Sequence, residues 1–196
     1  MLSIHNLTFQ GLGPFAFEVA DGECVAIQGA SGTGKSLLLR AIADLDPNAG
    51  DVRLDGVARE AFTGPQWRRR VGYLATDAGW WRPRVGDHFA DWSAVEADVE
   101  AFGLPPDCRD WEVARLSTGE RQRLALLRML GGGPKVLLLD EPTSALDEAT
   151  THAVEARIER QREAGCPVVW VTHDAAQARR VALRRFTLRD GELQAG

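Results

Sequence analysis

The apolar and polar positions of this chain alternate between two periods. Short runs rich in Val, Ile and Leu are separated by stretches in which apolar residues recur at helical spacing. This alternation is typical of an α/β domain with a mainly parallel central sheet. The apolar runs predict strands at residues 2–9, 15–19, 24–28, 52–54, 71–75, 136–140 and 168–172.

The segments between these runs predict how the strands are organised. Short turns rich in glycine join the earliest strands, so we expect antiparallel N-terminal strands beside the parallel sheet. A helix is predicted from about residue 34 to 44, because Pro47 stops it soon afterwards. Between residues 76 and 116 the strand signal disappears, and Phe89, Trp92, Val95 and Val99 recur at helical spacing. We therefore expect one domain, with a sheet core at 1–75 and 136–196 and a small inserted helical subdomain at 76–135.

Composition limits the class of protein. The chain has 196 residues, and 44% of them are hydrophobic, which suffices for one buried core. No run approaches the ~20 apolar residues that span a bilayer, and the first residues are typical of a strand and not of a secretion signal. A net charge of -5 argues against nucleic acid as a main partner. The three scattered cysteines, Cys24, Cys108 and Cys166, favour buried thiols over a disulfide framework or a zinc site. Because the chain shows neither a membrane-spanning run nor a secretion signal, we expect a cytoplasmic protein.

Residues 29–36 read GASGTGKS and match the phosphate-loop pattern G-x-x-x-x-G-K-[ST] at every fixed position. A glycine-rich turn between a strand and a helix aims backbone N–H groups and the positive helix end at a phosphate. In such loops the lysine, here Lys35, pairs the β- and γ-phosphates, and the hydroxyl, here Ser36, binds Mg²⁺. A plain glycine turn before a helix would not require all of these residues.

Two acids end one of the apolar runs. Residues 136–141 read VLLLDE, which is typical of a strand that is buried on both faces. Since burying two carboxylates without a task is costly, a simple helix-capping pair is the weaker interpretation. Asp140 suits the magnesium shell, through water, and Glu141 suits a general base that polarises the attacking water. A second such run, VVWVTH, ends at His173, which would lie beside the acids if the two strands are neighbours, although a lone histidine is usually structural.

Residues 116–120 read LSTGE and open a helix, so Ser117 and the first N–H groups of that helix form an anion-binding end. This signature turn stands some eighty residues downstream of the phosphate loop, so it makes sense as half of a site. In this order, GASGTGKS, LSTGE and VLLLDE resemble the ATP-binding cassette (ABC) family, the ATPase subunits and domains that drive membrane transporters. The resemblance covers nearly the whole chain.

The resemblance implies a P-loop NTPase fold and a head-to-tail dimer around two Mg-ATP, in which the signature turn of one chain closes over ATP held by the other. It also implies that His173 contacts the γ-phosphate, that Asp147 lies in the loop crossing to the partner subunit, and that Phe9 stacks on adenine. The implied ATP-binding set is Phe9, Gly29, Ala30, Ser31, Gly32, Thr33, Gly34, Lys35, Ser36 and Leu37. The implied signature set is Ser117, Thr118, Gly119 and Glu120, the metal set Ser36 and Asp140, and the catalytic set Glu141, His173 and Lys35.

Two positions depart from the family pattern. Thr118 adds a Cβ where the family has glycine. Thr76 stands where relatives commonly carry a glutamine that touches magnesium and senses the transport domain, and it is too short to do both. Direct ligation by Thr76, or compensation by Asp77, stays open. Trp80 and Trp81 follow, in the region where such cassettes receive the coupling helices of a membrane partner, and a packed core pair and a docking surface both fit them.

The resemblance as a whole implies an ATP-hydrolysing subunit of an ABC transporter. Its partners would be a second copy of itself and separately encoded membrane-spanning subunits, and it would lie on the inner face of the cell membrane. Two alternatives stay open. One is a soluble ABC-type ATPase of an assembly complex. The other is a degenerate module that only binds ATP, although Lys35, Asp140, Glu141 and His173 are all intact.

Overall fold

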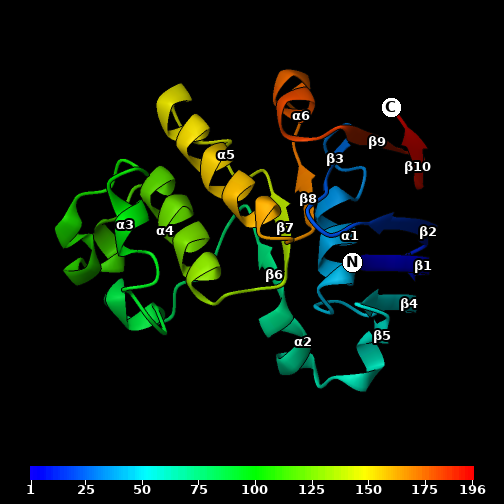
Figure 1. Ribbon diagram of the computed structural model, residues 1–196, viewed down its shortest axis with the longest axis horizontal. Coiled ribbons are helices and arrows are strands. Elements are labelled where there is room, and N and C mark those ends of the chain that lie inside the picture. The colour runs from blue at the N-terminus through cyan, green and yellow to red at the C-terminus, as the bar shows by residue number, and fades with distance from the viewer.

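Two sheets form the framework of the computed structural model, which describes residues 1–196 (Figure 1). The larger sheet has six strands in the order β10-β9-β3-β8-β7-β6. The strands from β9 to β6 pair in parallel, whereas β10 pairs antiparallel with β9. Their bounds are β3 Cys24–Gln28, β6 Val71–Leu74, β7 Val136–Asp140, β8 Val168–Val171, β9 Arg184–Arg189 and β10 Glu192–Ala195.

The smaller sheet is antiparallel throughout and has the order β2-β1-β4-β5. Its strands are β1 Leu2–Phe9, β2 Leu12–Val19, β4 Ala49–Leu54 and β5 Val57–Ala58. Its apolar face shares one hydrophobic cluster with helix α1, Lys35–Ile42, and with one face of the larger sheet. The smaller sheet and α1 therefore cover that face.

A second cluster covers the other face of the larger sheet. The helices on this side include α4, α5 and α6, and the short helix α3 lies beyond them at one end of the molecule (Figure 1). The α-helices after α1 are α2 Gly64–Arg70, α3 Glu96–Val99, α4 Thr118–Gly131, α5 Glu148–Glu163 and α6 Ala175–Val181. The 3₁₀ turns are η1 Arg59–Ala61, η2 Gly86–His88, η3 Pro106–Asp110 and η4 Val113–Arg115. None of the helices combines the length and apolar character needed to cross a bilayer.

The predicted fold class is confirmed, with a mainly parallel sheet and antiparallel N-terminal strands. Strand β7 has the predicted bounds, and β2 and β4 each begin three residues before the predicted start. The apolar pattern missed β9 and β10, because β9 carries arginines at both ends and only Leu188 in it is buried. β10 is the edge strand of the sheet and β9 lies next to it, where a continuous apolar run is not required.

The segment from residue 76 to 116 is less helical than its spacing suggests. Trp92, Val95 and Val99 are buried as the pattern implies, but only α3 is α-helical there, and 3₁₀ turns and loops hold the rest. The apolar spacing thus reports burial against α4 and not a long helix. Because Phe102 and Leu124 share a cluster with Leu137 of the sheet, one core runs from this segment into β7. The division into sheet core and helical subdomain at 76–135 stays a prediction.

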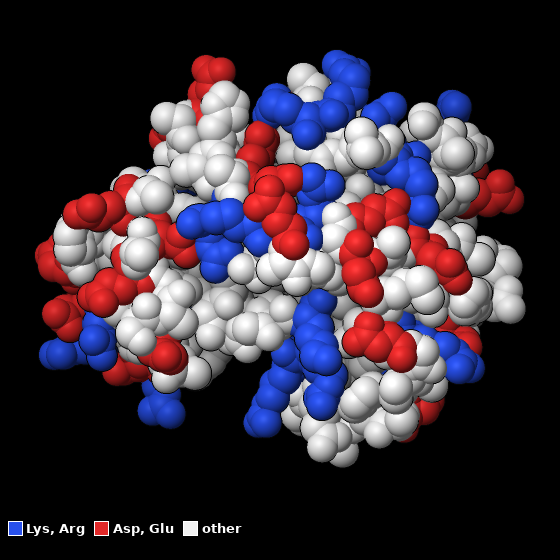
Figure 2. Space-filling model, viewed as in Figure 1, with Lys and Arg blue, Asp and Glu red and all other residues white.

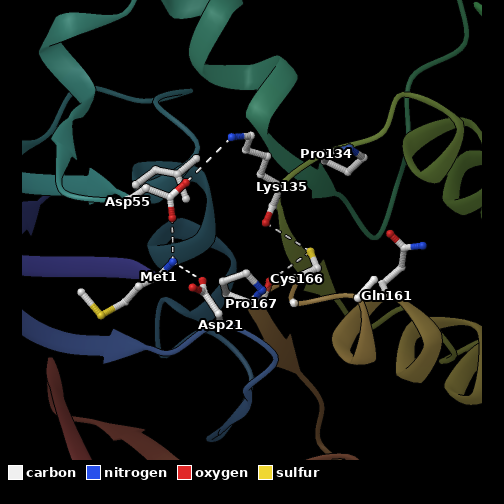
Figure 3. A pocket seen from close by; sticks show the side chains of 11 residues that line it. Met1, Asp21, Asp55, Pro134, Lys135, Gln161, Cys166 and Pro167 are labelled. Carbon is white, nitrogen blue, oxygen red and sulfur yellow. Dashed lines mark hydrogen bonds and ion pairs between the residues drawn. The ribbon is translucent and has the colours of Figure 1, made fainter.

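A polar pocket of about 440 Å³ lies at the amino ends of the parallel strands (Figure 3). The Met1 amino group donates to the carboxylates of Asp21 and Asp55, and the Lys135 ammonium lies 3.9 Å from Asp55. The Cys166 thiol donates to the Lys135 carbonyl at 3.3 Å. These contacts tie β1 to the segments that enter β7 and β8, at the edge of the sheet opposite the strand carboxyl ends.

The three cysteines are free and buried, which confirms the predicted buried thiols. Burial raises the pKa of Cys24 to about 12 and the pKa values of Cys108 and Cys166 to about 11. Because the thiolate is the reactive form, these side chains are poor nucleophiles at neutral pH.

A buried ion pair fastens α3 to α5. Asp98 accepts a hydrogen bond from Arg157 at 2.6 Å and another from Arg160 at 2.8 Å. The Asp98 and Arg157 side chains are 11% and 12% exposed, whereas Arg160 is 62% exposed. Removing the Asp98 carboxylate would leave the buried Arg157 guanidinium without a partner, and an unpaired buried charge is strongly destabilising.

We predict that Asp98→Ala lowers the free energy of unfolding by about 3 kcal/mol, the scale for one lost partner of a buried pair. Arg160→Ala is the matched control and should cost under about 1 kcal/mol, because that arginine is largely in water. Urea denaturation followed by circular dichroism measures both. Equal losses in the two variants would show that the buried pair does not hold α3 to α5.

Candidate functional site

The carboxyl ends of three adjacent parallel strands bring the predicted site residues to one edge of the sheet. β8 lies between β3 and β7, and Val171 is in register with Ile27 on one side and Asp140 on the other. The phosphate loop follows β3, Glu141 follows β7 and His173 comes shortly after β8. In α/β sheets this edge is where ligands bind.

The phosphate loop requires glycine at two positions. Gly29 and Gly34 have φ values of 147° and 101°, and a Cβ would come within 2.5 Å of the Leu188 carbonyl oxygen at Gly29 and 2.6 Å of Leu12 at Gly34. The loop then opens α1 at Lys35. The Lys35 ammonium folds back and donates to the carbonyls of Gly29 and Ala30 at 2.8 and 2.9 Å. The positive charge of the side chain is therefore held inside the loop.

Asp140 is 3% exposed at the end of β7. The Tyr73 hydroxyl donates to its carboxylate at 3.3 Å, and the Thr76 hydroxyl donates to its backbone carbonyl at 3.4 Å. Burial, reinforced by the neighbouring Asp140 charge, raises the pKa of Tyr73 above its usual value, so the phenol remains a neutral donor. The carboxylate of Asp140 and the exposed hydroxyl of Ser36 are two oxygen donors at this edge that fit a metal ion.

Glu141 and His173 form a hydrogen-bonded pair. The His173 Nδ1 lies 2.9 Å from the Glu141 carboxylate. The His173 side chain is 73% exposed, whereas that of Glu141 is 19% exposed. Glu141 has a φ of 51°, a left-handed conformation that costs on the order of 1–3 kcal/mol for a non-glycine residue. Its amide donates to the Val171 carbonyl at 3.1 Å, which anchors it to β8. Surrounding structure therefore holds this carboxylate in place.

Sequence reasoning missed Gln122. This residue is 5% exposed on α4, and its amide donates to the Glu141 carbonyl at 2.7 Å. The available signal was its place on the buried face of the helix, one turn before the apolar side chains Leu126 and Leu127, because a buried glutamine requires a polar partner. Gln122 links the helix that follows the signature turn to the backbone of Glu141.

The signature turn caps α4. The Ser117 hydroxyl accepts from the Glu120 amide at 3.3 Å and donates to its carboxylate at 2.8 Å, and that carboxylate also accepts from the Ser117 amide at 2.8 Å. The hydrogen bond from the Ser117 amide, and to a lesser extent the one from the Ser117 hydroxyl, lower the pKa of Glu120. Thr118 is exposed, whereas a Cβ at Gly119 would lie 3.2 Å from the Ala145 carbonyl oxygen. No hydrogen bond joins this turn to the phosphate loop of the same chain.

Two further predicted residues have local structural roles. Asp147 caps α5, accepting from the Thr150 amide at 2.8 Å and from its hydroxyl at 3.0 Å, and these bonds lower its pKa. Phe9 is 4% exposed and stacks on Phe15 with 5.3 Å between ring centroids. An adenine contact of Phe9 stays a prediction that requires the ring to turn out of the core, and the crossing role of Asp147 also stays a prediction.

Comparisons with known proteins agree with this geometry. The family model described as ABC transporter matches residues 12–144. The chain is 35% identical to the molybdenum import ATP-binding protein ModC of Rhizobium etli over 95% of its length, 39% identical to the probable iron export ATP-binding protein FetA of Escherichia coli over 81%, and 40% identical to the aliphatic sulfonates import ATP-binding protein SsuB of Pseudomonas putida over 88%. It spans 58%, 76% and 65% of the lengths of these three relatives.

Solved structures share the whole fold. A bacterial Atm1-family ABC exporter with ATP bound superposes with a TM-score of 0.87 at 26% identity, covering 100% of this chain and 38% of that one. A dimeric post-hydrolysis state of the ATP-binding cassette MJ0796, bound to ADP and Pi, gives 0.84 at 24% identity and covers 100% of this chain and 98% of that one.

Proposed function

The chain belongs to the ABC transporter family, and from this premise we propose that it binds and hydrolyses ATP as the ATPase subunit of a transporter. The observation that carries the proposal is the meeting of the phosphate loop, Asp140 and the Glu141–His173 pair at one edge of the sheet. Each of these groups has a defined task in phosphoryl transfer to water.

The phosphate loop supplies the binding energy for the nucleotide. Its backbone N–H groups and the start of α1 face the phosphates, as helix N-termini do in other anion sites. Lys35 leaves the carbonyls of Gly29 and Ala30 and pairs with the β- and γ-phosphates. The ammonium is thus already positioned in the loop. When ATP binds, charged phosphate oxygens replace the neutral carbonyl oxygens as acceptors of its hydrogen bonds.

Magnesium fits the donor set. Ser36 and Asp140 offer one hydroxyl and one carboxylate, and no group of three or more His, Cys, Asp or Glu side chains forms a separate cage. Magnesium is commonly held by one or two carboxylates, with water and substrate phosphates completing its shell. When bound it neutralises the charge that develops on the phosphates. Thr76 is close enough to the Asp140 backbone to act as a further ligand, and that role stays open.

Glu141 is the general base in this proposal. Its carboxylate accepts a proton from the water that attacks the γ-phosphorus, and the bond from that phosphorus to the leaving oxygen of ADP breaks. His173 hydrogen-bonds to the same carboxylate and so orients Glu141. In this proposal it also contacts the γ-phosphate. The retained pair favours hydrolysis over a module that only binds ATP.

A second copy completes each site. Ser117 and Thr118 are exposed at the start of α4 and make no hydrogen bond to their own phosphate loop, so they are available to a nucleotide on another chain. The dimer is therefore head-to-tail with two Mg-ATP between the chains. It acts on membrane-spanning subunits and lies on the inner face of the membrane. Because the relatives are named for import and for export of different cargoes, the proposal concerns the ATPase and not its cargo.

We predict that Glu141→Gln keeps ATP affinity but lowers steady-state hydrolysis by about 10²-fold or more, on the scale of general-base assistance. The glutamine retains the shape of the side chain but cannot accept the proton. A phosphate-release assay and nucleotide binding by fluorescence measure the two quantities. Turnover equal to that of the unsubstituted chain would remove Glu141 from the mechanism.

We also predict that Gln122→Leu lowers kcat about tenfold, which equals about 1.4 kcal/mol of barrier, while KM for ATP changes less than about twofold. The reason is that the Glu141 backbone loses a donor in the catalytic conformation, whereas the phosphate loop is untouched. Gln161→Leu, a glutamine that lines the remote pocket of Figure 3, serves as the control. A rise in KM with unchanged kcat, or an equal loss in the control, would contradict a positioning role for Gln122.

A further inference from the structure

A pocket of about 320 Å³ lies between α5 and α6, over β3 and β8. We call it the α5–α6 pocket. Figure 1 shows the two helices next to each other on one face of the larger sheet, and Figure 2 shows acidic and basic side chains side by side over this region. The volume falls at the lower end of the ~300–1,000 Å³ that small-molecule sites occupy. The mechanism proposed above uses none of the residues that line this pocket.

The floor of the pocket is apolar. Cys24 of β3 and Trp170 of β8 line it from the sheet, whereas Ile158 and Val181 line it from α5 and α6. Cys24 is 4% exposed and Trp170 is 1% exposed. Because burial raises the pKa of Cys24 to about 12, its thiol is neutral at neutral pH. An uncharged surface of this kind fits an apolar occupant.

The Trp170 indole supplies an unused hydrogen-bond donor in this floor. Its Nε1 is buried and has no hydrogen-bond acceptor in the chain. Trp67 is equally buried, but its Nε1 donates to the Ile42 carbonyl at 2.9 Å. Because buried polar groups are paired in nearly all folded proteins, an unpartnered indole N–H on a residue that lines a pocket points to a ligand that brings an acceptor.

The charged side chains that line the pocket neutralise one another. Arg180 of α6 donates to Glu155 of α5 at 2.9 and 2.7 Å. On α5 itself, Arg162 donates to Glu159 at 2.8 Å. Burial at Glu155 is outweighed by hydrogen bonds, foremost those from Arg180, so its pKa is lowered, as the bonds from Arg162 lower the pKa of Glu159. Of the charged and titratable side chains around the opening, only the exposed His152 stands outside these two ion pairs. The lining therefore favours an uncharged ligand.

The pocket adjoins a hydrogen-bond network that reaches the candidate site. Gln177 of α6 donates to the Glu155 carboxylate at 2.9 Å and to the Thr143 hydroxyl at 2.8 Å. Thr143 follows Glu141 and Pro142 in the chain. A molecule that contacts Glu155 in the pocket therefore bears on the loop that follows the general base.

We propose that the α5–α6 pocket binds a small, uncharged, apolar molecule that carries one hydrogen-bond acceptor. The apolar body of the molecule packs on Ile158 and Val181, and its acceptor takes the Trp170 N–H. A bound molecule changes the rate of ATP hydrolysis through Glu155 and Gln177. This effect on hydrolysis rests on the proposed function, whereas the binding rests on the pocket itself.

The test uses prodan, an uncharged naphthalene dye with one ketone oxygen, and a counterpart in which a methylene replaces the ketone carbonyl. Fluorescence anisotropy titrations without nucleotide should show prodan binding the unsubstituted chain at least ~3-fold more tightly than the counterpart, the scale of one net hydrogen bond. Trp170→Phe should remove this preference, because phenylalanine has no N–H to donate. A third dye with a carboxylate in place of the ketone should bind more weakly than both.

A second variant locates the site without touching the core. Ala156 is exposed and lines the pocket from α5, so Ala156→Trp should fill the pocket and weaken both uncharged dyes by at least ~10-fold, the scale of a lost binding anchor. Two matched controls should leave dye binding unchanged. Ala164→Trp places the same side chain in the remote pocket of Figure 3, and Trp67→Phe removes a buried indole elsewhere.

Three results would overturn the proposal: no binding of prodan, equal binding of prodan and its counterpart, or equal losses in the control variants. The dye pair and Ala156→Trp decide the matter even where Trp170→Phe does not fold, which circular dichroism shows. Self-association in sedimentation velocity that Ala156→Trp abolishes would assign the pocket to a second copy instead.

Hydrolysis distinguishes this proposal from the proposed function. Saturating prodan should change steady-state hydrolysis by the unsubstituted chain by at least ~2-fold and leave that of Ala156→Trp unaffected. Prodan binding with unchanged hydrolysis would overturn the link to the ATP site and retain the pocket as a binding site. A chain that binds prodan with the expected preference but does not hydrolyse ATP would overturn the ATPase proposal alone.

Discussion

The parallel pairing of β3, β8 and β7 is the constraint on which the rest of the structure depends. Only this strand order places the loop after β3 beside the acids after β7 and the histidine after β8. The order is stabilised by burial of both sheet faces, since one hydrophobic cluster packs against each. The strands β7 and β8 are fully buried, which explains why their sequences, VLLLD and VVWV, are nearly continuous apolar runs.

Helix α4 connects the signature turn to the carboxyl end of β7. Ser117 caps its start, and Gln122 holds the backbone of Glu141 one turn later. A helix moves as a unit, so a shift at one of these points displaces the other.

Much of the fold could be predicted from the sequence because buried strands leave a strong apolar signal. The core strands, the phosphate loop and the acid pair follow from that signal together with fixed motif spacing. The edge strand β10 and its neighbour β9 gave no such signal, since arginines occupy both ends of β9. In the site, Gln122 was missed because its function depends on a tertiary contact to a backbone carbonyl. The burial of Phe9 against Phe15 likewise depends on packing that no local pattern reports.

The central claim is that a second copy completes each ATP site with its signature turn. Disulfide crosslinking of a chain carrying Ser31→Cys and Thr118→Cys tests it most directly, because both positions are exposed, whereas Gly34 would not accept a side chain. The native cysteines can remain, since burial keeps them protonated. The account predicts a crosslinked dimer on a non-reducing gel that forms with Mg-ATP and not without nucleotide. Crosslinks confined to single chains, or dimers that form equally without nucleotide, would contradict the account.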